Sequence, residues 1–211
     1  MKTRIFNLII IDESGSMQSI KKAAIDSVNE TIQSIRAAEK YEDQEHIVSL
    51  VTFHNDVKNV YECVPVKEVK ELTAETYRPK CCTALYDAMG MSLNALLPKV
   101  AENDKVLVTV VTDGEENASK EYSGKAIKAL VDELKAKGWV FAYMGANQDV
   151  EAVAATISIT NVMHFEASDC GMKKLSGTLG KSRSRWFSKI AQGMSSAVED
   201  NCDFFNEDDE Y

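Results

Sequence analysis

Residues 5–17 read Ile-Phe-Asn-Leu-Ile-Ile-Ile-Asp-Glu-Ser-Gly-Ser-Met, an apolar run that ends abruptly in a carboxylate and two hydroxyls. A short apolar run followed by a polar, Gly-containing turn is typical of a strand buried on both faces, as in the centre of a parallel sheet. In open α/β sheets, ligands bind outside the carboxyl ends of the strands. Asp12, Ser14 and Ser16 therefore form a candidate site, with capping of the following helix as the alternative for any one of them.

The rest of the chain alternates predicted helices and strands. Apolar residues recur every three or four positions from Ile20 to Ile35, and strand-like runs follow at 47–53 and 57–64. The turn between these two runs is too short for a parallel crossover, so we expect the second run to be an antiparallel edge strand. The remaining predicted elements are a helix from Thr83 to about Leu97, a strand over 105–112, a helix over 123–137, a strand over 139–144, a short helix over 150–155, a strand over 161–165 and a long helix from about residue 168. This order predicts the α/β class, with a Rossmann-like, doubly wound, mostly parallel six-stranded sheet that has one antiparallel edge strand.

Length and charge indicate one domain with an acidic end. The chain has 211 residues, of which 45% are hydrophobic and 27% charged, as in ordinary globular proteins. Residues 199–211 contain seven acidic residues and no Lys or Arg, so most of the net charge of −9 lies there. We expect a single domain over 1–198, including a C-terminal helix, and an acidic, disordered tail over 199–211.

The basic residues of the last predicted helix are expected to form a solvated face rather than a nucleic-acid surface, because no aromatic interleaving or nucleic-acid motif accompanies them. These residues are Lys173, Lys174, Lys181, Arg183, Arg185 and Lys189.

Cysteine and apolar patterns bear on the compartment. The five cysteines form no CxxC pair and the three histidines form no HxxxH pair, so a zinc site has little support. No signal peptide precedes the first strand, and no later apolar run approaches the roughly 18 residues that a membrane span needs. We therefore expect a cytoplasmic protein with reduced thiols and no membrane association.

A second strand repeats the pattern of the first, since Asp113 and Gly114 directly follow the run 105–112. If the two strands are parallel, both deliver an Asp to the same sheet edge, where the crevice of a doubly wound sheet lies. Thr83 is expected to approach this edge from a loop, with helix capping as an equally weighted alternative. Carboxylates and hydroxyls are hard donors that favour Mg²⁺ or Mn²⁺ over zinc or copper. The predicted metal ligands are Asp12, Ser14, Ser16, Thr83 and Asp113.

Three segments resemble the parts of the metal-ion-dependent adhesion site (MIDAS) of von Willebrand factor A (vWA) domains, over about residues 3–165. They are Asp12-Glu13-Ser14-Gly15-Ser16, Thr83 and Thr112-Asp113-Gly114. The segments Thr-Asp-Gly-Glu-Glu-Asn and Gly-Ala-Asn-Gln-Asp are similar to bacterial cytoplasmic members, some associated with tellurium resistance. The resemblance implies a Mg²⁺ ion, with Mn²⁺ or Ca²⁺ as alternatives. The two serine hydroxyls and the threonine hydroxyl would bind it, with the two aspartates binding directly or through water.

One departure from the family pattern lies just before Thr83, where Cys81 and Cys82 stand in place of two frequent glycines. Simple substitution is the favoured interpretation. The alternative is a vicinal disulfide that moves Thr83, which is disfavoured because adjacent cysteines form a strained ring. Glu13 is expected to face solvent. Glu115 and Glu116 are expected to be solvated acids in a loop before a helix, with support of the metal ligands or selection of the partner as the alternative.

The predicted function is a metal-dependent protein-binding module without enzymatic activity, in which an Asp or Glu of a partner protein completes the coordination of Mg²⁺. No nucleophile–base pair or nearby His accompanies the site. One alternative is a Mg²⁺-dependent phosphatase or phosphoryl-transfer enzyme, which would need a second carboxylate where Ser14 stands and a lysine for the phosphate. The other is a scaffold with a vestigial metal site. The sequence predicts neither the identity of the partner nor the oligomeric state.

Overall fold

One central sheet organises the fold. The computed structural model describes residues 2–146 and 149–205, and this part of the chain contains six strands in the order β3-β2-β1-β4-β5-β6. β3 is antiparallel to β2, and every other neighbouring pair is parallel. The predicted class, topology and antiparallel edge strand are confirmed. The strands are β1 (Thr3–Asp12), β2 (Gln44–Phe53), β3 (Val57–Pro65), β4 (Lys105–Thr112), β5 (Trp139–Gly145) and β6 (Asn161–His164).

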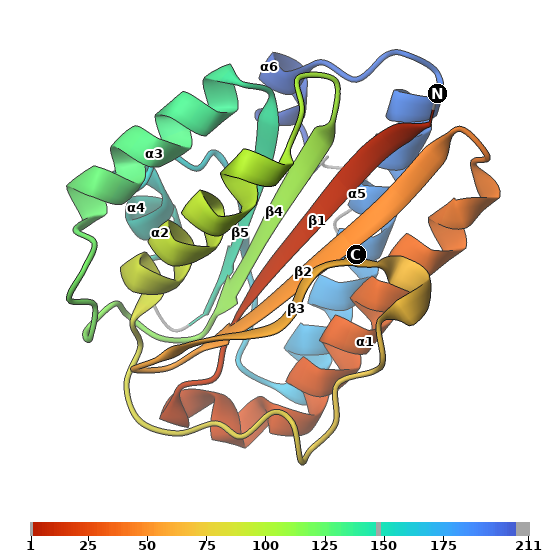
Figure 1. The fold of residues 1–211 in the computed structure, drawn as a ribbon. Coiled ribbons are helices and arrows are strands. Elements are labelled where there is room, and N and C mark those ends of the chain that lie inside the picture. The colour runs from red at the N-terminus through yellow and green to blue at the C-terminus, as the bar shows by residue number, and fades with distance from the viewer. Residues whose placement is uncertain (1, 147–148, 206–211) are drawn as a thin grey trace.

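Helices cover both faces of the sheet (Figure 1). On one face lie α1 (Lys21–Ala37) and α5 (Asp169–Ala191), and on the other lie α2 (Leu85–Leu96), α3 (Gly124–Ala136) and α4 (Val150–Thr156). Alternate β1 residues enter the two cores, for example Ile9 on the α1 and α5 side and Ile10 on the opposite side. This arrangement explains the continuous apolar run, because neither face of β1 contacts water. Short helical segments complete the described chain at Gly15–Ile20, Ala38–Lys40, Val66–Glu68, Leu97–Lys99 and Ala197–Asp200 (α6).

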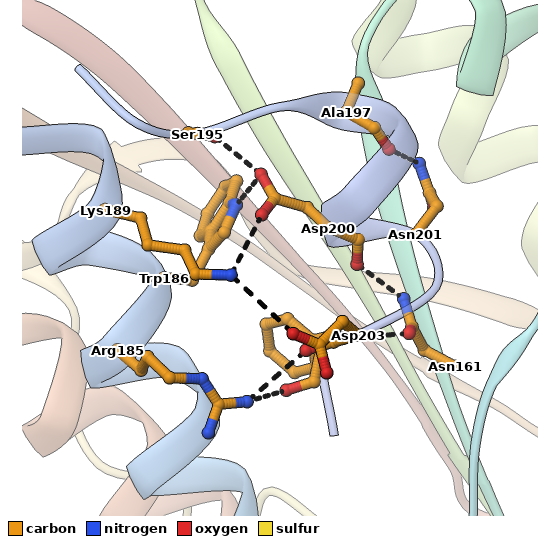
Figure 2. A network of polar contacts seen from close by, with 10 residues as sticks. Asn161, Arg185, Trp186, Lys189, Ser195, Ala197, Asp200, Asn201 and Asp203 are labelled. Atoms are coloured by element: carbon orange, nitrogen blue, oxygen red, sulfur yellow. Dashed lines mark hydrogen bonds and ion pairs between the residues drawn. The ribbon is translucent and has the colours of Figure 1, made fainter. Parts of the chain in front are cut away.

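The acidic C-terminal segment packs on the domain, in contrast to the predicted tail. Asp200, Asn201 and Phe204 are all buried. Figure 2 shows Asp200 within a polar network, where its Oδ2 accepts hydrogen bonds from Trp186 Nε1 at 2.9 Å and Ser195 Oγ at 2.6 Å. The packed domain therefore extends past residue 198 to at least Phe204. Residues 206–211 of the predicted tail lie outside the described residues.

Asn201 completes the hydrogen bonding of β5. β6 pairs with β5 over residues 142–145, which leaves the first part of β5 without a strand on that side. Asn201 Oδ1 accepts from Phe141 N at 3.1 Å, and Asn201 Nδ2 donates to Trp139 O at 2.8 Å. Asn161 in turn donates through Nδ2 to Asp200 O at 2.9 Å, which ties the segment to β6. A side-chain amide thus satisfies backbone groups that burial would otherwise leave unpaired.

Arg183 is buried, so its predicted place on a solvated face is wrong. Its side chain donates hydrogen bonds to Ser34 Oγ of α1 and Thr109 Oγ1 of β4, each at 3.4 Å. Burial lowers the pKa of Arg183 to about 9. The physical reason is its spacing, since Arg183 continues the four-residue stripe of Leu175 and Leu179 that faces the sheet.

Because His46 is buried, we expect the free energy of unfolding to fall at acid pH. Its Nε2 lies 3.2 Å from Gln44 Oε1, its ring packs against Phe187, and burial lowers the pKa of His46 to about 4. In the unfolded chain a histidine pKa is about 6.5. Below that pH the unfolded chain binds a proton that the folded chain does not, so this group should lower the free energy of unfolding by up to about 3 kcal/mol between pH 6.5 and 4, and change nothing above pH 6.5.

Urea unfolding from pH 7.5 to 4.5 measures this effect. His46→Gln should remove most of the loss, since the variant cannot titrate in this range. A parallel decline in wild type and variant would show that other groups cause it.

Candidate metal site

Asp12 is the last residue of β1, and its side chain is fully buried with both carboxylate oxygens bonded. Asp12 Oδ1 accepts from Ser14 N at 2.7 Å, and Oδ2 accepts from Thr112 Oγ1 at 2.6 Å. One donor comes from the loop after β1 and the other from the end of β4. These bonds fix the orientation of the carboxylate.

Asp113 lies beside the loop after β1, as the strand-end pattern predicts. β1 and β4 are adjacent and parallel, with Ile11 opposite Val111. Ser16 Oγ donates to Asp113 Oδ1 at 2.6 Å and lies 3.1 Å from Ser14 Oγ. The structure therefore brings the two carboxylates and two hydroxyls together, while their role as metal ligands stays a prediction.

Thr83 reaches the same place from the loop before α2. It is buried and does not cap α2, whose N-cap residue is Ala84. A methyl group placed on Gly114 would lie 3.0 Å from Thr83 Oγ1, 3.6 Å from Ser16 Oγ and 3.7 Å from Asp12 Oδ2. Three oxygens thus surround one small space beside Gly114, two from the segment 12–16 and one from the loop before α2, and the lack of a side chain on Gly114 keeps this space open.

The electrostatics of this space favour a cation. Burial raises the pKa of Asp12 to about 6, with a smaller contribution from the charge of Asp113 and with the hydrogen bonds from Thr112 and Ser14 opposing the rise. Burial also raises the pKa of Asp113. A bound cation would offset both negative charges. Within the described residues, no three His, Cys, Asp and Glu side chains are grouped to hold a metal, so hydroxyl oxygens would complete the set, which suits a hard ion such as Mg²⁺.

The segment 77–81 holds the loop after β1 in place. Tyr77 Oη donates to Asp12 O at 2.5 Å, and Gly15 N donates to Cys81 O at 3.2 Å. Glu13, predicted to be solvated, is buried instead, and its carboxylate accepts a hydrogen bond from Arg78 N. The donor stands 65 residues away in the sequence, and so no local pattern indicates this contact.

Glu116 is the second acid whose predicted solvation is wrong. Its carboxylate accepts from Tyr86 N at 2.9 Å, Ala118 N at 2.9 Å, and Ser119 N and Oγ at 2.8 and 2.6 Å. Glu115 is exposed, as predicted. Glu116 therefore binds the loop after β4 to the first turn of α2, whose backbone N–H groups need acceptors.

Comparison with known proteins identifies the family. A family model for the von Willebrand factor type A domain matches residues 8–177. The chain belongs to the vWA family. No curated protein matches it. The narrower resemblance of this vWA domain to tellurium-resistance-associated members stays a prediction.

Solved structures share the vWA fold at low identity. The PilB minor pilin from Streptococcus sanguinis has 13% identity and a TM-score of 0.62, with 92% of this chain and 63% of that chain covered. The ArnB paralog VWA2 from Sulfolobus acidocaldarius has 19% identity and a TM-score of 0.59, with 85% and 45% covered. Proximal thread matrix protein 1 from the mussel byssus, with a zinc-occupied MIDAS motif, has 14% identity and a TM-score of 0.56, with 87% and 46% covered. The chain spans less than two thirds of the length of each, and at these identities the likeness shows the fold alone.

Of the two adjacent cysteines of this vWA domain, Cys81 occupies a loop position that suits glycine. Cys81 has a φ of 61°, in the left-handed region, at a cost of roughly 1 kcal/mol for a residue with a side chain. Both thiols are free and exposed, and Cys82 N donates to Asn55 Oδ1 at 3.1 Å. The conformation accounts for the glycine that family members often carry at the first position.

Proposed function

We propose that this vWA domain is a metal-dependent protein-binding module whose Mg²⁺ ion engages an Asp or Glu side chain of a partner protein. The observation that carries the proposal is that oxygens of the segment 12–16 and of Thr83 surround the space beside Gly114, while Ser16 also bonds to the Asp113 carboxylate. Mn²⁺ and Ca²⁺ are the alternative ions. The residues that would hold the metal are Asp12, Ser14, Ser16, Thr83 and Asp113.

The proposed metal ligands differ in burial, which supports binding of a partner protein at the exposed side of the site. Asp12, Ser14, Thr83 and Asp113 are buried, whereas Ser16 is exposed. When bound, Mg²⁺ supplies positive charge and a coordination position for an oxygen from outside. The protein's own contribution is to orient Asp12 through Thr112 and to keep the space open at Gly114. The zinc-occupied MIDAS motif of the mussel protein supports a metal at this edge of the fold.

Titration of Mg²⁺ alone into the protein by calorimetry tests the metal site. Wild type should bind, and Asp113→Ala should bind at least about a hundredfold more weakly because a charged ligand is lost. Asp56→Asn, an exposed change in the turn between β2 and β3, is the matched control and should bind as wild type does. Equal affinity in wild type and Asp113→Ala would refute the site.

A pull-down then tests the partner. A protein that is captured in the presence of Mg²⁺, released by a chelator and not captured by Asp113→Ala supports the module, whereas capture that does not depend on Mg²⁺ contradicts it.

The five free cysteines favour a reducing compartment, so the cytoplasm is part of the proposal. Within 2–146 and 149–205, no helix combines the length and the apolar character that a membrane crossing requires.

Binding without catalysis is also part of the proposal. His54, in the turn between β2 and β3, accepts hydrogen bonds at its Nδ1 from the backbone N–H groups of Asn55 and Asp56, at 2.6 and 3.1 Å, so this nitrogen is already engaged. Incubation with a generic aryl phosphate and Mg²⁺ should give no turnover. Hydrolysis that needs both Mg²⁺ and Asp12 would establish the phosphatase alternative.

Gly114→Ala is expected to weaken Mg²⁺ binding at least about tenfold without unfolding the protein. The added methyl would stand 3.0 Å from Thr83 Oγ1, in the space that the site oxygens surround. Calorimetric titration, together with thermal unfolding of the metal-free protein, measures both effects. Gly180→Ala on α5 is the matched control, since its methyl meets nothing within 4 Å, and it should leave affinity unchanged. Unchanged affinity in Gly114→Ala would place the metal elsewhere.

A further inference from the structure

Asn117 holds the peptide groups of Thr83 on both sides. Thr83 N donates to Asn117 Oδ1 at 2.9 Å, and Asn117 N donates to Thr83 O at 3.0 Å. Ala118 N also donates to Thr83 O at 3.2 Å. The donor and the acceptor of the Thr83 main chain are therefore both bound by the loop after β4, which lies 34 residues away in the sequence.

The residues on either side of Thr83 are held by a different segment. Cys82 N donates to Asn55 Oδ1 at 3.1 Å, and Ala84 N donates to His54 O at 2.8 Å. Both acceptors belong to the turn between β2 and β3. Ala84 N belongs to the same planar peptide group as Thr83 O, so His54 and the loop after β4 hold that group together. The peptide group on the other side of Thr83 differs, because its N–H donates to the Asn117 side chain, and the orientation of Thr83 therefore depends on Asn117.

The loop that carries Asn117 is anchored firmly enough to act as a clamp. Glu116 accepts four hydrogen bonds, one of them from Tyr86 N of α2. In return, Asp87 of α2 accepts from the backbone N–H groups of residues 120, 121 and 122, at 2.7 to 2.9 Å. Two carboxylates, one from each side, thus join the loop to α2, and both are satisfied mostly by backbone donors.

We propose that Asn117 is a positioning residue of the metal site, which sets the place of the Thr83 hydroxyl. Asp113, Gly114 and Asn117 belong to one short loop, so the carboxylate, the open space and the clamp on Thr83 keep fixed relative positions. Thr83 Oγ1 lies 3.0 Å from the point where a methyl on Gly114 would stand, which places the clamped hydroxyl at the open space. The Mg²⁺ measurements below rest on the proposed function, whereas the exchange measurement does not.

Two substitutions of Asn117 distinguish the effect of its acceptor atom Oδ1 from the effect of the size of its side chain. Asn117→Leu keeps the size but removes Oδ1, and should weaken Mg²⁺ binding by about 10- to 100-fold, as loss of a residue that orients a metal ligand does. Asn117→Asp keeps an acceptor for Thr83 N and should stay within about threefold of wild type. Equal affinity of the Leu variant and wild type would overturn the proposal.

A double-mutant cycle tests whether Asn117 acts through Thr83. In the Thr83→Ala background, Asn117→Leu should have little further effect on Mg²⁺ affinity, because the hydroxyl that Asn117 positions is already absent. Additive losses would show that Asn117 affects the site by another route.

Amide hydrogen exchange of the metal-free protein gives a readout that does not need metal. Asn117→Leu should accelerate exchange at the Thr83 amide, while the Cys82 and Ala84 amides, bonded to Asn55 and His54, keep their wild-type rates. Equal acceleration along all of α2 would show general destabilisation and overturn the clamp. If wild type binds no Mg²⁺, the proposed function fails while Thr83 exchange still tests the clamp.

Discussion

Asp12→Asn is expected to abolish measurable Mg²⁺ binding and, in the metal-free protein, to raise the free energy of unfolding by about 2 kcal/mol at pH 7. The Asp12 carboxylate is fully buried near Asp113, and burial raises its pKa to about 6. The Asn side chain carries no charge but can keep both contacts. Its Oδ1 can accept from Ser14 N, and its Nδ2 can donate to Thr112 Oγ1. Removing a buried charge therefore stabilises the empty fold while it destroys the site.

Unfolding in urea with a chelator and with saturating Mg²⁺ separates the two effects. Mg²⁺ should stabilise wild type, because it binds the folded state, and should leave Asp12→Asn unchanged. Asp56→Asn, an exposed change, should match wild type in both conditions. Retained binding in Asp12→Asn would exclude Asp12 as a ligand. A metal-free variant that is less stable than wild type would show that the bonds from Thr112 and Ser14 outweigh the cost of the buried charge.

A chain that ends at residue 198 is expected to lose about 4 kcal/mol of stability or more, a large part of the roughly 5–15 kcal/mol of a typical domain. The deletion exposes the surface that buried Phe204 covers, worth about 2 kcal/mol. It also leaves Trp186 Nε1 without Asp200, and Phe141 N and Trp139 O without Asn201, at about 1–3 kcal/mol for each buried group left unsatisfied.

The matched control is a chain that ends at Phe205, which keeps every contact just described. Urea unfolding of the two truncated chains isolates the contribution of residues 199–205. Equal stability of the two would mean that these contacts add nothing net, and that the network in Figure 2 forms without stabilising the fold.

The sheet and the approach of the two aspartates were predictable because they follow from local patterns. A strand buried on both faces needs a continuous apolar run, and β1 and β4 both have one. Asp12 and Asp113 come at or directly after the ends of these strands, so parallel pairing brings them to one edge. The direction of Thr83 is different, since it depends on Asn117, and neither spacing nor composition indicates that bond.

The wrong predictions concern charged residues whose partners are remote. Glu13 and Glu116 lie in loops and read as solvated acids, yet backbone N–H groups from other segments bind both carboxylates. Acid-rich composition likewise suggested a solvated tail, although Asp200 meets Trp186 of α5. Arg183 is the exception, because its four-residue spacing with apolar residues gave a local signal that its charge obscured.

The amide of Asn201 also bears on the behaviour of the protein at high concentration. Without it, Trp139–Phe141 would present free backbone donors and acceptors at a sheet edge, within the apolar strand Trp-Val-Phe-Ala-Tyr-Met-Gly. Such an edge is a template on which a strand of another molecule can add, the first step of β-aggregation. A single side chain fills this edge and offers no new strand to extend it. The C-terminal segment therefore protects the first part of β5 against pairing with a strand of another molecule.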